Sequence, residues 1–235
     1  MNKRYLLVLP AFNQMDRISE IICEAKKFDV EILAIDDGST DDTGQILSGI
    51  KEINKIYNKN NLGYGQTLIN SFQYGIKNGY DFLITMDTDG QHLPAEIPAF
   101  IKEAPNWDIV SGSRYLNNTV RDSNVPQDRY DINKKITLKI NEITKFNITD
   151  SFCGFKAYSV NSLKKLSIDE PGYGMPLQLW IQAWKHGFRI KEIPVRRIYK
   201  DFTKRFGAGL HNAEVRLKYY NSIIENELDR LYVKN

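Results

Sequence analysis

Cysteine is scarce in this chain: its 235 residues contain only Cys23 and Cys153. The two lie far apart, and neither belongs to a Cys-x-x-Cys pair, so the sequence predicts neither a zinc site nor a disulfide framework. A chain without such crosslinks fits a reducing compartment.

Long apolar runs and a strong net charge are also missing. No stretch approaches the roughly 20 apolar residues that span a bilayer, and the apolar run that ends at Pro10 is too short for a signal peptide. The net charge is only +3, which points to no nucleic-acid partner. We therefore expect a cytoplasmic protein that at most binds peripherally to a membrane surface.

What is present is the composition of an ordinary globular protein, at 42% hydrophobic and 26% charged residues. Residues 1–235 fit a single domain with a sizeable core. In the first half, apolar strands are expected at residues 5–9, 30–35, 53–57, 82–86 and 108–111. Helices are expected between them, at 16–28 with Asp16 as N-cap, at 45–50 after a cap at Thr40 or Asp41, up to Asn78, and at 94–103. This alternation predicts an α/β fold, with a mostly parallel sheet covered by helices on both faces.

The second half is less regular. Residues 116–130 are polar and without periodicity, which predicts a long surface loop. Helices are expected at 134–146, 161–166, 175–186 and 212–231, and a strand is expected at 189–199. Residues 150–159 are expected to form a loop that leads into a further strand. The last helix carries an apolar stripe of Leu217, Tyr220, Ile224 and Leu228, which we assign to the core or an interface rather than to a membrane anchor.

Two carboxylates end the strand at 82–86. Asp87 and Asp89 are one residue apart, so at the end of a strand both lie on the same side and can converge on one cation. Magnesium is usually held by one or two carboxylates together with substrate phosphates. Taken alone, Asp87-Thr88-Asp89-Gly90 fits a polar turn equally well. However, Asp36 and Asp37 end the strand at 30–35 in the same way, and ligands of such sheets bind at this edge.

Other segments carry weaker signals. The glycine-rich stretch 60–67 lacks both common phosphate-loop patterns and favours a tight strand-to-helix connection. The basic stretch 200–209 fits either a solvated loop or a lid that brings cations to a diphosphate.

We expect His92 in a surface or loop role, and Cys153 as a small buried residue rather than a nucleophile. Together the motifs indicate a nucleoside-diphosphate ligand with a bridging metal.

Six short motifs, in this order, resemble those of family 2 glycosyltransferases, especially the branch acting on dolichyl or polyprenyl phosphate. They are residues 10–14, 36–43, 61–63, 87–91, 112–115 and 153–155. The resemblance covers about residues 4 to 200. It implies a GT-A fold, a nucleotide-sugar donor, a Mg²⁺ or Mn²⁺ ion and inversion at the anomeric carbon. It also implies a donor-binding part at 1–115, an acceptor-side part with a lid at 116–210, and a C-terminal helix at 211–235.

The resemblance also assigns roles to individual residues. The nucleotide pocket would be lined by Pro10, Phe12 and Gln14, and Asp36 or Asp37 would hold the base or ribose. The metal and the donor diphosphate would be held by Asp87, Asp89 and Gln91. The cations facing phosphate groups would be Arg114, Lys200, Lys204 and Arg205.

The chain departs from the family pattern at two places. Gln14 stands where the family usually has Glu, although an amide still donates and accepts hydrogen bonds. The helix expected after Gly174 lacks the acid that related enzymes often carry there. A hydroxyl acceptor needs a general base, whereas a lipid phosphate arrives ionised. The sequence therefore favours a phosphate acceptor. Asp150 is the candidate base if the acceptor is a hydroxyl, and otherwise caps the loop before Cys153.

We thus expect an inverting glycosyltransferase with polyprenyl or dolichyl phosphate as acceptor. The alternatives are transfer to a saccharide hydroxyl in cell-surface polysaccharide synthesis and a catalytically silent nucleotide-sugar-binding module. Nucleotidyl transfer is disfavoured because residues 10–14 lack a glycine-rich basic loop. A homodimer or a membrane partner protein is a further expectation for the final helix.

Overall fold

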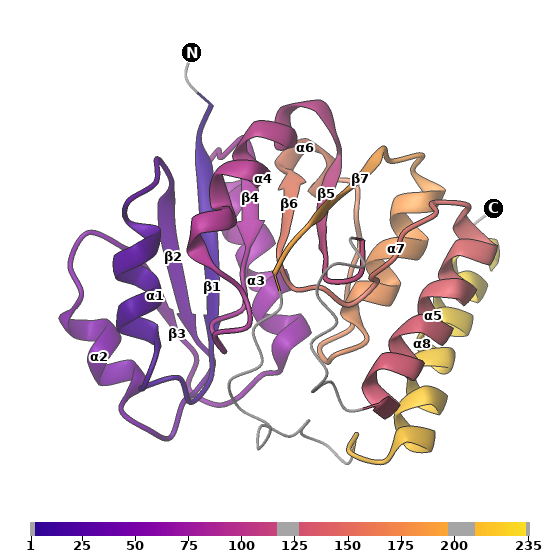
Figure 1. The fold of residues 1–235 in the computed structure, drawn as a ribbon, viewed down its shortest axis with the longest axis horizontal. Coiled ribbons are helices and arrows are strands. Elements are labelled where there is room, and N and C mark those ends of the chain that lie inside the picture. Colours follow the sequence, from indigo (N-terminus) through magenta and orange to yellow (C-terminus); the bar gives the residue numbers. More distant parts are fainter. Residues whose placement is uncertain (1–2, 117–126, 197–209, 234–235) are drawn as a thin grey trace.

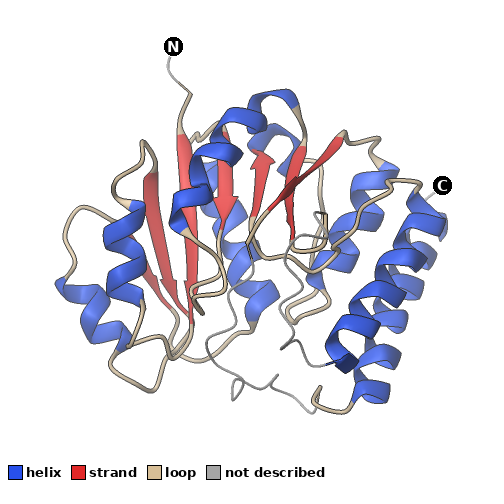
Figure 2. Cartoon of the chain, in the orientation of Figure 1, coloured by secondary structure: helices blue, strands red, loops and turns tan. Residues whose placement is uncertain are grey.

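The protein is described here by a computed structural model, which covers residues 3–116, 127–196 and 210–233. A seven-stranded sheet has the order β3-β2-β1-β4-β6-β5-β7. Its strands are β1 (Tyr5–Ala11), β2 (Glu31–Asp36), β3 (Asn54–Tyr57), β4 (Phe82–Thr85), β5 (Ile109–Ser113), β6 (Lys156–Ser159) and β7 (Ile190–Pro194). Only β6 runs antiparallel to its neighbours, β4 and β5. The predicted mostly parallel sheet is therefore confirmed (Figure 2).

Helices cover both faces of this sheet (Figure 1). They are α1 (Ile18–Ala25), α2 (Thr43–Gly49), α3 (Tyr64–Lys77), α4 (Ile97–Glu103), α5 (Gln127–Thr144), α6 (Val160–Leu163), α7 (Met175–Lys185) and α8 (Ala213–Val233). Leu7 and Leu9 of β1 face a core built with α1, α2 and α4, whereas Leu6 and Val8 face the core of α3 and α5 to α8. Because both faces are covered, β1 is a continuous apolar run.

Some predicted boundaries were wrong. Residues 127–130 belong to α5 rather than to the surface loop, because the charged first turns of this helix hide the apolar spacing. The residue preceding α1 is Arg17 rather than Asp16, and α2 follows Asp42 rather than Thr40 or Asp41. The remainder of the polar loop, 117–126, and the basic stretch through 209 lie outside the described residues.

One prediction about the final helix can be checked. The stripe on α8 packs into the core, with Tyr220 and Ile224 buried and Leu217 and Leu228 partly buried against it. Over the described ranges, the structure contains no helix with the length and apolar character needed to cross a bilayer.

The sheet brings together the ends of β2 and β4, the two strands that lead into paired aspartates. The strand β1 lies between β2 and β4 and is parallel to both, with Ala11 opposite Asp36 and Val8 opposite Thr85. Their carboxyl ends therefore share one edge, as predicted. This edge is where the site lies.

Candidate functional site

A pocket of about 1060 Å³ opens at the carboxyl edge of the sheet. Most of the predicted site residues line it, namely Pro10, Phe12, Gln14, Asp37, Asp87, Asp89, Gln91 and Arg114. The described lining does not include Asp36 or Asp150. Lys200, Lys204 and Arg205 lie outside the described residues.

Asp87 and Asp89 form the acidic centre of the pocket. The Asp87 side chain is 29% exposed, and its Oδ1 accepts a hydrogen bond of 2.8 Å from Tyr64 Oη. Burial and the adjacent charge of Asp89 raise the Asp87 pKa to about 6. Asp89 accepts hydrogen bonds from the backbone N and the side-chain Nε2 of Gln91, at 3.0 and 2.7 Å. A cation bound between the two carboxylates would relieve their repulsion.

This donor set fits a hard divalent cation that shares its coordination with substrate. Within the described parts of the chain, no group of three or more His, Cys, Asp or Glu side chains could hold a metal. Two carboxylates are nevertheless what magnesium uses when phosphates and water complete its shell. Gln91 donates to Asp89 in this conformation, so it orders that carboxylate.

The carboxylates of Asp36 and Asp37 have different surroundings. Asp37 faces the pocket, while its oxygens accept hydrogen bonds from Asn58 Nδ2, Leu62 N and Gly63 N at 2.8 to 3.0 Å. Asp36 is buried and accepts from Ser39 N at 3.0 Å. Of the two alternatives for a nucleotide contact, the structure presents Asp37 to the pocket.

The loop after β1 supplies a further part of the pocket lining. Phe12 is 41% exposed, so its ring is open to a ligand. The Gln14 side chain donates from Nε2 to the Phe12 carbonyl at 3.1 Å, and its backbone N donates to Thr43 Oγ1 at 2.7 Å. These bonds fix the loop at the mouth of the pocket.

Asp150 is not arranged as a general base. Its carboxylate is fully buried and accepts hydrogen bonds from Arg114 Nε at 2.7 Å, Arg114 Nη2 at 2.9 Å and Asn133 Nδ2 at 2.9 Å. Burial opposes ionisation, but the Arg114 charge and these hydrogen bonds outweigh it and hold the Asp150 pKa below its usual range. Phe152 N also donates to Oδ1 at 3.2 Å, which is the loop-capping role. A carboxylate with both oxygens occupied and a low pKa is a weak proton acceptor.

Two other sequence expectations can be compared with the structure. His92 lies in a loop, which is one of the two expected roles, but it is buried rather than on the surface, and its Nε2 lies 3.8 Å from Asp87 Oδ2. Burial and then the Arg114 charge lower the His92 pKa to about 3, so this imidazole is neutral. Cys153 is a small buried residue, as expected. Its burial raises the thiol pKa to about 12, so the thiol is a poor nucleophile at neutral pH.

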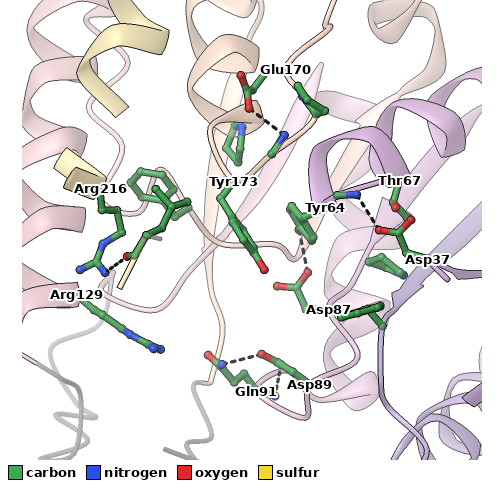
Figure 3. Close-up of a pocket in the computed structure, with 18 of the residues that line it drawn as sticks. Asp37, Tyr64, Thr67, Asp87, Asp89, Gln91, Arg129, Glu170, Tyr173 and Arg216 are labelled. Carbon is green, nitrogen blue, oxygen red and sulfur yellow. Dashed lines mark hydrogen bonds between the residues drawn. The ribbon is translucent and has the colours of Figure 1, made fainter. Parts of the chain in front are cut away.

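Sequence reasoning missed a pair of tyrosines in the pocket. Tyr64, the first residue of α3, stacks on Tyr173 with ring centroids 6.0 Å apart and an interplanar angle of 14°. Figure 3 shows Tyr173 between the two sides of the pocket. Each tyrosine is followed by a glycine; Tyr64 begins α3, and Tyr173 lies just before α7. This shared pattern is the sequence signal that could have indicated their role in the pocket.

The second half of the pocket is different in character. It is lined by Arg129 from α5 and Arg216 from α8, which Figure 3 places on the side away from Asp87 and Asp89. Arg216 is paired with Asp128 at 2.7 Å. The apolar lining of this half is supplied by Ile132, Phe152, Pro176, Leu210 and Val215. The pocket therefore joins an acidic half to a basic and apolar half.

Comparison with known sequences settles the family. Residues 6–167 match the family described as Glycosyl transferase family 2. The chain belongs to this family. It is 27% identical, over 97% of its length and 90% of the relative's, to polyprenol monophosphomannose synthase of Mycolicibacterium smegmatis. It is 26% identical, over 84% of its length and 85% of the relative's, to undecaprenyl-phosphate mannosyltransferase of Micrococcus luteus.

The fold agrees with this assignment. The structure resembles glucosyl-3-phosphoglycerate synthase from Mycobacterium tuberculosis, crystallised with Mg²⁺ and uridine diphosphate, with a TM-score of 0.68 and 18% identity. The alignment covers 96% of this family 2 chain and 79% of the other. The predicted GT-A fold is thereby confirmed, and the protein is a glycosyltransferase by family and fold.

Proposed function

We propose that this chain transfers a hexosyl group from a nucleoside-diphosphate sugar to a polyprenyl or dolichyl phosphate, with inversion at the anomeric carbon. The observation that carries the proposal is the two-part pocket. Asp87 and Asp89 lie on one side, and Arg129, Arg216 and an apolar wall lie on the other. An anionic leaving group with a cation suits the first side, and an amphipathic anion suits the second.

The donor would lie along the β1 and β4 ends. The base and ribose would contact Pro10, Phe12, Gln14 and Asp37. Mg²⁺ or Mn²⁺ would be held by Asp87 and Asp89, with Gln91 as a further oxygen donor. The ion would supply Lewis-acid stabilisation of the charge that develops on the departing diphosphate. Arg114, Lys200, Lys204 and Arg205 would contribute cations to the phosphate groups.

The acceptor would enter beside α5 and α8. A phosphate oxygen of the lipid would attack the anomeric carbon from the face opposite the diphosphate. The bond from that carbon to the diphosphate oxygen would break, and its electron pair would leave with the nucleotide. Because the phosphate is already ionised, no proton has to be removed. This agrees with the occupied carboxylate of Asp150.

The relatives support this acceptor class, since the names of both include a polyprenyl lipid. Residues 1–115 would then serve the donor, 116–210 the acceptor and 211–235 the supporting helix. Because such a lipid resides in a membrane, the enzyme would work peripherally at the cytoplasmic surface. A homodimer or membrane partner that contacts the exposed side of α8 stays a prediction.

Calorimetric titration of UDP and GDP in the presence of Mn²⁺ tests the donor site. We expect the double variant Asp87→Ala plus Asp89→Ala to lose metal-dependent binding. A matched control is Asp29→Ala plus Asp229→Ala, which makes the same change in charge at exposed positions. Donor affinity that is unchanged in the Asp87 and Asp89 variant would overturn the proposal.

Product assays test the acceptor. Radiolabelled sugar should appear on polyprenyl phosphate and not on an oligosaccharide. Transfer to the oligosaccharide instead would favour the hydroxyl acceptor. Nucleotide binding without any transfer or donor hydrolysis would favour the silent binding module.

A further inference from the structure

Tyr64 stands between the acidic centre and the loop that separates the two halves of the pocket (Figure 3). We propose that Tyr64 is a positioning residue that fixes the Asp87 carboxylate for the metal and diphosphate, and that the 170–174 loop holds Tyr64 in place. This inference rests on the function proposed above, but it concerns residues to which that function assigns no role.

The first step is the contact with Asp87. Tyr64 Oη donates to Asp87 Oδ1 at 2.8 Å, a hydrogen bond from a phenol to a carboxylate. On another side the carboxylate lies against the backbone of Gly154. A Cβ at this glycine would come within 2.1 Å of Oδ2 and 2.3 Å of Oδ1. Asp87 is therefore held at a fixed rotation, which orients the remaining lone pairs of its oxygens.

The second step is the support of Tyr64 itself. Its ring stacks on Tyr173. The backbone beside it is tied to the same loop, because Gln66 N donates to the Pro171 carbonyl at 3.0 Å. Gly65 packs so closely that a Cβ would lie 2.3 Å from the Glu170 carbonyl oxygen. The start of α3 and the loop are therefore held together by a ring stack, a backbone hydrogen bond and a close backbone contact.

The third step leads to the C-terminal helix. Tyr219 of α8 donates from Oη to Glu170 Oε1 and accepts from Gly174 N at 3.1 Å. Glu170 Oε1 also accepts from Gly172 N at 2.9 Å. The loop is thus anchored to α8, which helps to line the basic and apolar half of the pocket. The ring of Tyr173, from the same loop, contacts Tyr64 beside the acidic half. A side chain that acts through a ligand in this way is expected to tune metal affinity.

The test is Mn²⁺ binding, measured by electron paramagnetic resonance with UDP and, in parallel, with GDP. Tyr64→Phe removes only the hydroxyl, and we expect Mn²⁺ binding about 10-fold weaker or more. Tyr80→Phe is the matched control, because Tyr80 Oη donates to Glu31 Oε2 at 2.7 Å away from the pocket. Tyr80→Phe should lower the melting temperature as Tyr64→Phe does, without changing Mn²⁺ affinity.

A second variant tests the support from the loop. Tyr173→Leu removes the stacked ring and leaves the Tyr64 hydroxyl in place, so Mn²⁺ binding should weaken by a smaller factor. Wild-type Mn²⁺ affinity in a folded Tyr64→Phe variant would overturn the inference while leaving the proposed function intact. If Tyr64→Phe does not fold, unchanged affinity in Tyr173→Leu overturns it. Failure of the wild-type protein to bind Mn²⁺ with either nucleotide would overturn the proposed function and this inference with it.

Discussion

Arg114 and Asp150 form a two-pronged ion pair beneath the pocket, with Nε to Oδ2 at 2.7 Å and Nη2 to Oδ1 at 2.9 Å. The Asp150 side chain is fully buried, and that of Arg114 is 14% exposed. Parallel bonds of this kind fix both partners in orientation as well as in distance. The pair connects the end of β5 to the turn before β6 and gives Arg114 its direction towards the pocket.

Breaking this pair should destabilise the fold. Asp150→Asn leaves a buried guanidinium without its countercharge, and we expect the free energy of unfolding to fall by about 3–5 kcal/mol. Urea denaturation measures the change. The control is Glu225→Gln, whose partner Lys139 forms a surface pair, and the expected loss is at most about 1 kcal/mol. Equal losses in the two variants would contradict a buried, structural ion pair.

The same pair predicts a pH dependence. The Asp150 pKa is lower in the folded protein than in the unfolded chain, so its ionisation stabilises the fold at neutral pH. That contribution is fully present above the unfolded pKa of about 3.9 and is lost as the pH falls below it. Urea midpoints between pH 5 and pH 3 should therefore fall more steeply in the wild type than in Asp150→Asn. Parallel slopes would refute the prediction.

A buried glutamate joins α7 to α8. Glu227 Oε2 accepts from Gln178 Nε2 at 2.8 Å, and Oε1 accepts from Gln182 Nε2 at 3.0 Å and Arg230 Nη2 at 2.9 Å. Glu227→Ala leaves the buried amides without this acceptor. The expected cost is about 1–3 kcal/mol for each unsatisfied group. Urea denaturation of Glu225→Ala, an exposed neighbour on α8, provides the comparison, and a similar loss there would count against the network.

Arg129 should act on the acceptor and not on the donor. Arg129→Met removes a cation from the basic half of the pocket. We expect KM for polyprenyl phosphate to rise about 10-fold, equivalent to about 1.4 kcal/mol, with the donor KM unchanged. Steady-state kinetics with each substrate varied in turn measure both constants. Lys134→Met, at an exposed site on α5, is the control, and a rise in donor KM alone for Arg129→Met would be inconsistent with this role.

Removing the metal should cancel stabilisation by nucleotide. With Mn²⁺ and a nucleoside diphosphate at 100 times its dissociation constant, the folded state should gain about 2.7 kcal/mol. A thermal shift assay should show this gain, and excess EDTA should abolish it. A nucleotide-induced shift that persists in EDTA would mean that Asp87 and Asp89 do not bind the diphosphate through a cation.

Much of the framework was predictable because it depends on local pattern. The apolar runs of β1, β2 and β4 have no polar alternation, since both faces of the sheet are covered. The alternation of these strands with helices indicated a mostly parallel sheet, and parallel strands place Asp37, Asp87 and Asp89 at a common edge. The stripe on α8 followed from helical spacing in the same way.

The partners of the site residues depended on tertiary structure. Asp36 and Asp37 are adjacent in sequence and both are buried, yet only Asp37 lines the pocket, because successive side chains at a strand end point in opposite directions. The position of β6 between β4 and β5 was also not readable from the chain order.

Local pattern was enough to predict the first strands, the carboxylates that follow them and the family that their order indicates. The side chains that these carboxylates contact were set by the packing of the whole chain. Arg114 forms an ion pair with Asp150, which lies 36 positions later in the sequence. Tyr64 donates a hydrogen bond to Asp87, which lies 23 positions later. Hydrogen bonds and ion pairs of this kind depend on distances of about 3 Å, and only packing of the sheet and its helices brings these side chains that close.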